Sequence, residues 1–529
     1  MRLLEQTLTC GLFGLTQGLS TIQWPNTLLT YADQQLYEGS LGVLTENCPA
    51  RDNTTIPAQW LRIAYHDMST HNVDDGTGGL DASTQFELDR PQNIGEGMLD
   101  SLNDFAAFRI QAPFFGTADI IALGAVFAVA GCGGPTIPYR AGRVDVTEAG
   151  PATVPEPQQD LATHIESFRR QGFTQPEMIA LVACGHTLGG VRQADFPEVV
   201  TDNSTVLRTF DTTPAFDTAI VSEYLQNTTQ NVLVIGPNIT TRSDFRIFSS
   251  DGNDTMQSLL SPDNFNNTCS SLFERMLNTV PNDVKLTDPL LEPFQYLVSD
   301  PVFSFRNASL TMSLSLRVLN NNPSRTVKLL WTDRQGSFCP PSGCSSPSIS
   351  TEQVFFSLIG QMQGATAQRY LFNATINGAT SISKFWFEVD ENDGSEPIVV
   401  DNRGTGFGIE QDSVFVDIGR SATIFLPTFD ELRTIVVAVR GDATSSNASL
   451  SLFTPGSGPN APFTPTLDSV DLQLDTSNPP EGGYTFYTSN ITIAPTFLDV
   501  TATTTSERLL RRILTWFEVI SLSYSYRLK

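Results

Sequence analysis

Apolar residues recur at helical spacing through the first half of the chain, from about residue 20 to about residue 290. Segments such as MLDSLNDFAAFRI, ADIIALGAVFAVAG and DLATHIESFRRQGF show this spacing. A further segment, PEMIALVACGHTLGGV, follows Thr174, which forms a capping box with Glu177 and so marks a helix start. His186 should therefore lie deep in that helix. The pattern predicts a mainly helical domain over residues 21–290.

Beyond about residue 300 the pattern changes to short alternating runs rich in β-branched and aromatic residues, such as SLTMSLSLRVL, KFWFEVDE and TIVVAVRG. Turn residues separate these runs. They predict a β-rich, sandwich-like C-terminal domain over residues 300–505. Residues 506–529 carry Arg508, Arg511 and Arg512 beside apolar residues, which predicts one short amphipathic helix of unknown role.

The first twenty residues have a basic start, an apolar stretch and small residues near the end, which predicts a signal peptide over residues 1–20. Glu5 and Gln6 interrupt the stretch, so an ordinary amphipathic N-terminus is the alternative. Glycosylation sequons along the whole chain favour a secreted, extracellular protein. No apolar run reaches about eighteen residues, so we expect no transmembrane segment. The sequons begin at Asn53, Asn203, Asn227, Asn238, Asn253, Asn266, Asn307, Asn373, Asn447 and Asn490.

The formal net charge of −26 argues against nucleic-acid binding, which needs clustered Lys and Arg. Of the seven cysteines, Cys10 would leave with a signal peptide. The remaining six are scattered, which fits disulfides better than a zinc site with paired C-x-x-C elements. Their pairing cannot be deduced from spacing. They are Cys48, Cys132, Cys184, Cys269, Cys339 and Cys344.

The segment WLRIAYHDM places Arg62 and His66 four residues apart, on one face of a helix. Such a pair can divide the work of breaking a peroxide, because a neutral His moves the proton while Arg stabilises the departing charge. Taken alone the spacing is common. His186 lies in LVACGHTLGG, where Gly189 and Gly190 leave room for a flat cofactor, although a lone His is more often a core residue.

Four motifs occur in order: R-x-x-aromatic-H-D at Arg62, G-x-D-x-S at Gly79, G-R-x-D at Gly142 and G-H-T at Gly185. The series resembles the plant-type haem peroxidase superfamily over about residues 40–285, and the fungal secreted class II most. The resemblance implies a haem b cofactor and oxidation of a donor by hydrogen peroxide.

On this resemblance His66 is the distal acid and base, Arg62 stabilises charge, and Asn93 orients His66. His186 is the axial iron ligand, and a buried Asp should accept a hydrogen bond from its other nitrogen. Asp251 in FRIFSSDGN is the predicted partner, with Asp254 as the alternative because the segment has one extra residue.

Other haem contacts and a disulfide are implied in the same way. Phe210 should stack beneath the haem, and Pro155 in the segment VPEP should line its exposed edge. Cys48 and Cys132 should form a disulfide. Cys184 has no family counterpart, so a free, buried thiol is one possibility and a bond to Cys269, Cys339 or Cys344 is left open.

The resemblance also implies two calcium ions with hard oxygen ligands. The first would hold the distal helix from behind. The second would lie beside His186, in a loop one residue shorter than usual. The implied ligands are Asp67, Gly79, Asp81 and Ser83 at the first site, and Thr187, Asp211, Thr213 and Asp217 at the second.

Several positions differ from those of class II peroxidases, and these differences limit which reducing substrates the protein could oxidise. The positions of a manganese site hold Thr55, Gln59 and Arg192, so the three carboxylates of that site are missing. The position of the exposed tryptophan of lignin peroxidases holds Leu181, and Tyr65 stands where the class usually has Phe. These departures favour small, phenol-like donors oxidised at the haem edge.

Two hypotheses follow. The first is a secreted peroxidase that acts on hydrogen peroxide and a small donor. The second is a surface or cell-wall binding protein that uses its β-rich half beside a degenerate peroxidase scaffold. Aromatic residues of that half, including Trp331, Trp386 and Phe387, could contact carbohydrate but are more often core residues.

Overall fold

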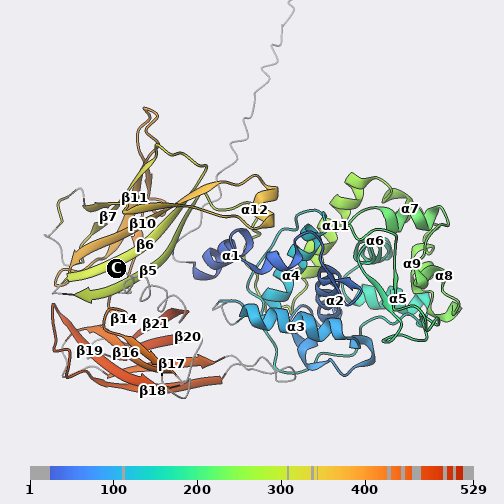
Figure 1. The fold of residues 1–529 in the computed structure, drawn as a ribbon, viewed down its shortest axis with the longest axis horizontal. Coiled ribbons are helices and arrows are strands. Elements are labelled where there is room, and N and C mark those ends of the chain that lie inside the picture. Colours follow the sequence, from blue (N-terminus) through green and yellow to red (C-terminus); the bar gives the residue numbers. More distant parts are fainter. Residues whose placement is uncertain are drawn as a thin grey trace, which may run out of the picture.

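The computed structural model has a helical N-terminal half and a strand-rich C-terminal half, side by side (Figure 1). Both predicted classes are confirmed. The described residues are 24, 26–109, 114–306, 309–334, 339–341, 343–410, 412–425, 431–441, 447–454, 466–492, 497–503 and 508–515. The predicted signal peptide and residues 516–529 lie outside them.

The helical half is built around α4, which is buried on every side and packs against α2. Its segment TADIIALGAVFAVAG is apolar all round, as expected for a central helix. The helices are α1 (Thr27–Tyr37), α2 (Ile56–Met68), α3 (Glu96–Arg109), α4 (Thr117–Gly131), α5 (Leu161–Arg170), α6 (Gln175–His186), α7 (Ala219–Leu225), α8 (Val232–Ile235), α9 (Ser243–Phe248), α10 (Asp254–Ser258) and α11 (Pro262–Leu277), with α12 (Leu358–Met362) in the C-terminal half.

The strand-rich half contains two bodies rather than the single sandwich that the sequence predicted. The first is a sandwich of the sheets β5-β6-β10-β9 and β12-β11-β7-β8, whose inner faces share one core. Its strands are β5 (Tyr296–Arg306), β6 (Ser309–Leu319), β7 (Thr326–Thr332), β8 (Cys344–Pro347), β9 (Ser350–Gln353), β10 (Ala367–Asn377), β11 (Lys384–Asp390), β12 (Ile398–Val400) and β13 (Phe407–Gly408).

The second body is an antiparallel sheet of order β14-β16-β19-β18-β17-β20-β21, with β15 paired to β16 and a core of its own. Alternation explains why both bodies have cores: on β11, for example, Phe385, Phe387 and Val389 are buried while their neighbours are not. The strands are β14 (Val414–Val416), β15 (Ala422–Phe425), β16 (Glu431–Arg440), β17 (Asn447–Thr454), β18 (Thr466–Leu474), β19 (Tyr484–Ile491), β20 (Phe497–Thr503) and β21 (Arg508–Thr515). Short strands β1 (Ala50–Arg51), β2 (Thr54–Thr55), β3 (Gly190–Arg192) and β4 (Leu207–Thr209) belong to the helical half.

The prediction of a helix over residues 506–529 is wrong for residues 508–515, the part of this segment that the structure describes. These form β21, which pairs antiparallel with β20 from Thr503↔Arg508 onward. Pairing satisfies the backbone groups along the edge of β20, and this outweighs a helical pattern that is short.

The two halves share a core and hydrogen bonds. Phe356 and Ile359 near α12 are buried in the same cluster as the helical core, and α12 lies against α1 and α4 (Figure 1). Ser357 Oγ donates to Leu36 O at 2.6 Å. Ahead of α1, Trp24 Nε1 donates to Gly408 O at 2.9 Å. Both halves therefore bury apolar surface against each other.

Three disulfides use all six cysteines that would remain after loss of a signal peptide. The predicted Cys48–Cys132 bond is confirmed, with Cα atoms 4.6 Å apart. Of the possibilities left open for Cys184, the free thiol is wrong, because Cys184 pairs with Cys269 and links α6 to α11. Cys339 and Cys344 form the third bond. No helix of the described part of the chain is long and apolar enough to cross a membrane.

Candidate active site

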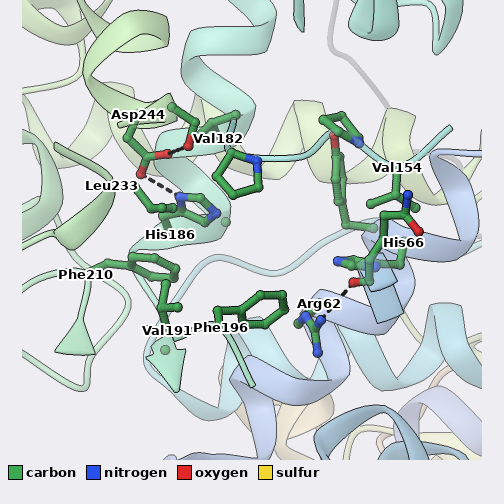
Figure 2. A pocket seen from close by; sticks show the side chains of 18 of the residues that line it. Arg62, His66, Val154, Val182, His186, Val191, Phe196, Phe210, Leu233 and Asp244 are labelled. Atoms are coloured by element: carbon green, nitrogen blue, oxygen red, sulfur yellow. Dashed lines mark hydrogen bonds and ion pairs between the residues drawn. The ribbon is translucent and has the colours of Figure 1, made fainter. Parts of the chain in front are cut away.

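Helix α2 places Arg62 and His66 side by side on one wall of a cavity of about 520 Å³. Thr55 caps the helix by accepting a hydrogen bond from Ala58 N at 3.2 Å. Trp60 and Ile63 on its other face are buried in the core, which fixes the rotation of the helix. In Figure 2 His66 and Arg62 lie across the cavity from His186.

A hydrogen bond to Asn93 holds His66. Its Nδ1 lies 2.7 Å from Asn93 Oδ1, and since a carbonyl oxygen accepts, Nδ1 carries the proton. The lone pair is then on Nε2. Burial and, as a smaller cause, the charge of Arg62 lower the pKa of His66 to about 3. The hydrogen bond to Asn93 acts in the opposite direction and raises the pKa, but it is the smaller effect. His66 is therefore neutral at physiological pH and can act as a base.

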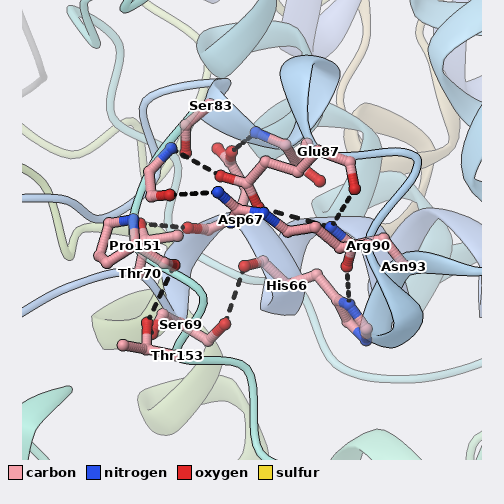
Figure 3. Close-up of polar contacts among 12 residues, drawn as sticks. His66, Asp67, Ser69, Thr70, Ser83, Glu87, Arg90, Asn93, Pro151 and Thr153 are labelled. Atoms are coloured by element: carbon pink, nitrogen blue, oxygen red, sulfur yellow. Dashed lines mark hydrogen bonds and ion pairs between the residues drawn. The ribbon is translucent and has the colours of Figure 1, made fainter. Parts of the chain in front are cut away.

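Glu87 orients Asn93, which sequence reasoning missed. Asn93 Nδ2 donates to Glu87 O at 3.1 Å, and Gly150 N donates to Glu87 Oε1 at 2.8 Å. Arg90 Nη1 lies 2.9 Å from Glu87 Oε2, and the side chain of Glu87 is fully buried (Figure 3). A Glu side chain is seldom fully buried unless it is paired, and the burial that identifies Glu87 cannot be read from the sequence.

Arg62 is anchored by backbone carbonyls. Its Nη2 donates to Gln92 O and Ile94 O, both at 3.1 Å. Burial lowers the pKa of Arg62 to about 10, and the charge of Asp195 opposes that shift. Arg62 thus keeps its positive charge at neutral pH and presents it beside His66.

Across the cavity, His186 is the last residue of α6 and forms a hydrogen bond with Asp244 of α9. Nδ1 of His186 lies 2.8 Å from Asp244 Oδ2, and Asn231 Nδ2 donates to the same oxygen at 2.7 Å. Burial favours the neutral carboxyl, but His186 and the hydrogen bonds outweigh it and lower the pKa of Asp244. The Nε2 atom of His186 is left for a ligand.

The partner predicted for His186 was wrong. Asp251 accepts from Thr255 N at 3.0 Å instead, and the alternative Asp254 begins α10. The predicted Ser-Asp pattern also occurs at Ser243 and Asp244, seven residues earlier. Helix α9 turns that earlier carboxylate toward α6, whereas Asp251 follows α9 in a turn.

Phe210 stacks on His186, with ring centroids 4.1 Å apart and ring planes inclined by 14°. Pro155 and Val154 line the cavity, as does Tyr65. Tyr65 Oη lies 3.5 Å from Gln171 Oε1, and burial raises the pKa of Tyr65.

These residues fit a haem. The volume is in the range of cofactor sites, and the wall is mostly apolar. A side chain at Gly185, immediately before His186, would meet no atom within 4 Å, so the helix leaves open space there. His186 would hold the iron, with Phe210 packed against the imidazole of His186 and with Arg62 and His66 on the opposite wall of the cavity.

The loop behind α2 gathers oxygen atoms that suit a hard cation. Asp67 accepts from Ala82 N at 2.7 Å and from Thr84 N at 3.0 Å. Burial, and then the charge of Asp81, raises the pKa of Asp67. Ser83 Oγ is buried and finds no hydrogen-bond partner in the described part of the chain. The loop brings together the four predicted ligands Asp67, Gly79, Asp81 and Ser83.

A second such group lies at the end of α6. Thr213 Oγ1 donates to Asp217 Oδ2 at 2.9 Å, and Thr187 Oγ1 donates to Asp217 O at 2.8 Å. Burial raises the pKa of Asp211 to about 7, to which the charges of Asp217 and Glu223 add. Its Oδ2 has no hydrogen bond among the described residues. Neither group holds three or more His, Cys, Asp or Glu side chains placed for a metal, and the described residues contain no such cluster.

Two of the three aromatic residues considered for carbohydrate contact are not accessible. Trp331 and Phe387 are buried in the core of the sandwich, at 6% and 0% exposure. Trp386 is half-buried on the other face of β11, beside Gly343.

Residues 44–263 match the family model described as Peroxidase. A WSC domain-containing protein of Arthroderma benhamiae is 35% identical over 355 residues, which are 64% of this chain and 47% of that protein. Putative L-ascorbate peroxidase 6 of Arabidopsis thaliana is 37% identical over 24% of this chain and 40% of its own length. Mitochondrial cytochrome c peroxidase of Yarrowia lipolytica is 35% identical over 30% of this chain and 48% of its own. The matches thus span less than half of each of these relatives.

Proposed function

Since residues 44–263 belong to the plant-type peroxidase superfamily, we propose that the chain is a secreted haem peroxidase that reduces hydrogen peroxide and oxidises small, phenol-like donors. The observation that carries this proposal is the placement of a neutral His66 and a charged Arg62 opposite the His186–Asp244 pair, across one cavity.

Bound haem supplies the iron and the redox chemistry. The protein supplies proton transfer and charge. Nε2 of His66 takes a proton from one peroxide oxygen and returns it to the other, so that the O–O bond breaks and water leaves. Arg62 stabilises the negative charge on the departing oxygen. Asn93 keeps the proton on Nδ1 throughout, and so keeps Nε2 available as the base.

On the other wall, Asp244 fixes the ring orientation of His186 and increases its basicity as a ligand. Asn231 and Ser243 hold the carboxylate in place through hydrogen bonds. A strongly basic imidazole would favour the oxidised state of an iron bound to His186.

Two further parts of the proposal concern ions and compartment. Calcium at the loop behind α2 and at the end of α6 is supported by the raised pKa values of Asp67 and Asp211, since a cation would relieve their burial. Secretion is supported by three disulfides, which persist in oxidising compartments. Contact with carbohydrate or a cell wall is a second candidate role for the β-rich half, resting on Trp386.

The test is the visible spectrum of the purified, haem-loaded protein before and after one equivalent of hydrogen peroxide. We expect a Soret band that shifts on addition in the wild type, a rate lower by about 10²–10⁴ in His66→Ala, and loss of haem in His186→Ala. His71→Gln is the matched control, because His71 bonds to Gly78 O outside the cavity. Failure to bind haem, or an unchanged rate in His66→Ala, would contradict the proposal.

A further inference from the structure

Besides Asp244, three carboxylates line the cavity. Glu156, Asp195 and Glu198 all belong to its wall, and Glu198 is exposed. They come from two segments: Glu156 precedes α5, and the other two follow β3. A donor that enters the cavity therefore meets acidic side chains, of which Glu198 is exposed to solvent.

Positive charge at this opening is already paired. Arg192 lines the cavity as well, but its Nη1 lies 3.3 Å from Glu96 Oε2 and its Nε lies 3.6 Å from Asp195 Oδ2. No lysine is present in the described cavity wall. The carboxylates of Glu96 and Asp195 thus share the guanidinium of Arg192, while Glu156 and Glu198 add two further carboxylates to the cavity wall.

Two other guanidinium groups belong to this region: Arg62, which lines the cavity and whose charge interacts with that of Asp195, and Arg246. Arg246 donates to Pro157 O and to Gln159 O at 2.8 Å, so it lies behind the segment that carries Glu156. Its charge interacts with those of Asp160 and Asp244. Arg62 is deep in the wall, where it donates to two carbonyl groups.

We propose that this acidic opening selects the electron donor by charge, so that cationic one-electron donors, such as protonated aromatic amines, are oxidised in preference to anionic ones. This rests on the proposed function and names its donor class. Two donors lose one electron each, and these two electrons with two protons convert hydrogen peroxide to two waters.

The size of the effect follows from Coulomb's law. One charge pair about 4 Å apart in water contributes about 1 kcal/mol, or about fivefold in a rate. At physiological salt, interactions between exposed charges more than about 8 Å apart are largely screened. The net charge of −26 adds a longer-range attraction for cations. We therefore expect a preference of about tenfold or more at low salt that shrinks as salt is added.

Ferrocene derivatives provide donors of similar size and different charge. The haem-loaded protein is assayed with (ferrocenylmethyl)trimethylammonium, ferrocenemethanol and ferrocenecarboxylate at about 10 mM and about 500 mM salt. We expect the ratio of kcat/KM for the cation to that for the anion to fall about fivefold or more in Glu198→Lys, whereas ferrocenemethanol serves as the neutral reference. Comparing one ratio between variants cancels the differing potentials of the donors.

Glu46→Lys is the matched control, since Glu46 is exposed and does not line the cavity, and it makes the same change in net charge. We expect its ratio to stay within about twofold of the wild type. A Glu46→Lys ratio that falls as far as that of Glu198→Lys would overturn the local origin, because net charge alone would then explain it.

A second readout needs no turnover. Benzamidine and benzoate, similar in size and opposite in charge, are titrated into the resting protein by calorimetry, and we expect benzamidine to bind more tightly, with the difference reduced in Glu198→Lys. Oxidation of ferrocenemethanol without any charge preference would overturn the inference and leave the proposed function standing. Absence of any reaction with peroxide would overturn the proposed function, and the titration would still decide whether the opening selects cations.

Discussion

Arg317 of β6 joins the two halves of the protein, and replacing it with Met should destabilise both. Its side chain is completely buried, and Nη1 lies 2.6 Å from Asp33 Oδ1 and 2.7 Å from Glu38 Oε1. Nη2 donates to Phe294 O at 3.0 Å. Asp33 lies on α1 and Glu38 directly follows it, so the guanidinium connects a helix of one half to a strand of the other.

The expected loss follows from what the substitution leaves behind. In Arg317→Met, Glu38 keeps its ion pair with Arg369, but the fully buried Asp33 carboxylate loses its cation. Removing one partner of a buried ion pair costs about 3–5 kcal/mol, since the remaining charge is uncompensated. Burial already raises the pKa of Asp33, with Arg317 opposing that shift, so Asp33 in the variant should take up a proton on folding.

Urea unfolding measures this loss, with far-ultraviolet circular dichroism for the helical half and tryptophan fluorescence for the whole chain. We expect a lower midpoint in Arg317→Met, and two separate transitions where the wild type shows one. Lys328→Met is the control: the exposed Lys328–Glu388 pair should contribute at most about 1 kcal/mol. The double variant Arg317→Met, Asp33→Leu should recover part of the loss, because it removes the stranded charge.

A loss below about 1 kcal/mol in Arg317→Met, equal to that of the Lys328→Met control, would refute the reasoning. It would mean that water reaches Asp33 or that the halves are held together by apolar contacts alone.

Three further predictions concern the site. Asn93→Leu removes the acceptor that fixes the proton on His66 Nδ1, so stopped-flow measurement should show at least about a tenfold slower reaction with peroxide. Asp244→Asn replaces a buried carboxylate by an amide, which should weaken haem binding and raise the reduction potential in a spectroelectrochemical titration. Glu177→Gln should cost up to about 1 kcal/mol at pH 6, since Arg275 lowers the pKa of Glu177 to about 2 and the stabilisation is present above its ordinary pKa. That difference should shrink as the pH falls toward 2, as measured by urea unfolding at each pH.

The distal part of the site could be predicted because its geometry is local. Arg62 and His66 are four residues apart on one helix, so the helical period alone places them together. Predicting Asn93 required the family pattern, because this residue lies in a 3₁₀ turn that is distant from α2 in the sequence. Glu87 could not be found, because only the burial of its side chain beneath the backbone of Gly150 reveals it.

The partner of His186 depends on the number of residues between helices, and the prediction from the sequence was wrong here. Ser-Asp pairs occur at Ser243 and at Ser250 before Asp251, and both follow His186 at distances that a loop could span. Periodicity cannot choose between them. The short helix α9 makes the choice, because it aims Asp244 at α6. The partner of Cys184 could not be predicted for the same reason, since Cys269 lies on α11, 85 residues away.

The β-rich half is therefore more than an appendage that follows a complete peroxidase domain. Helix α1 lies at the start of the chain, yet Asp33 and Glu38 face strands β6 and β10, and Ser357 bonds to the end of α1. A truncation after residue 290 would expose this buried face and leave Asp33 without Arg317. The sequence predicted two successive domains, and chain order cannot show the long-range pairing between them. The burial of these charges indicates instead that the helical half needs the sandwich in order to be stable.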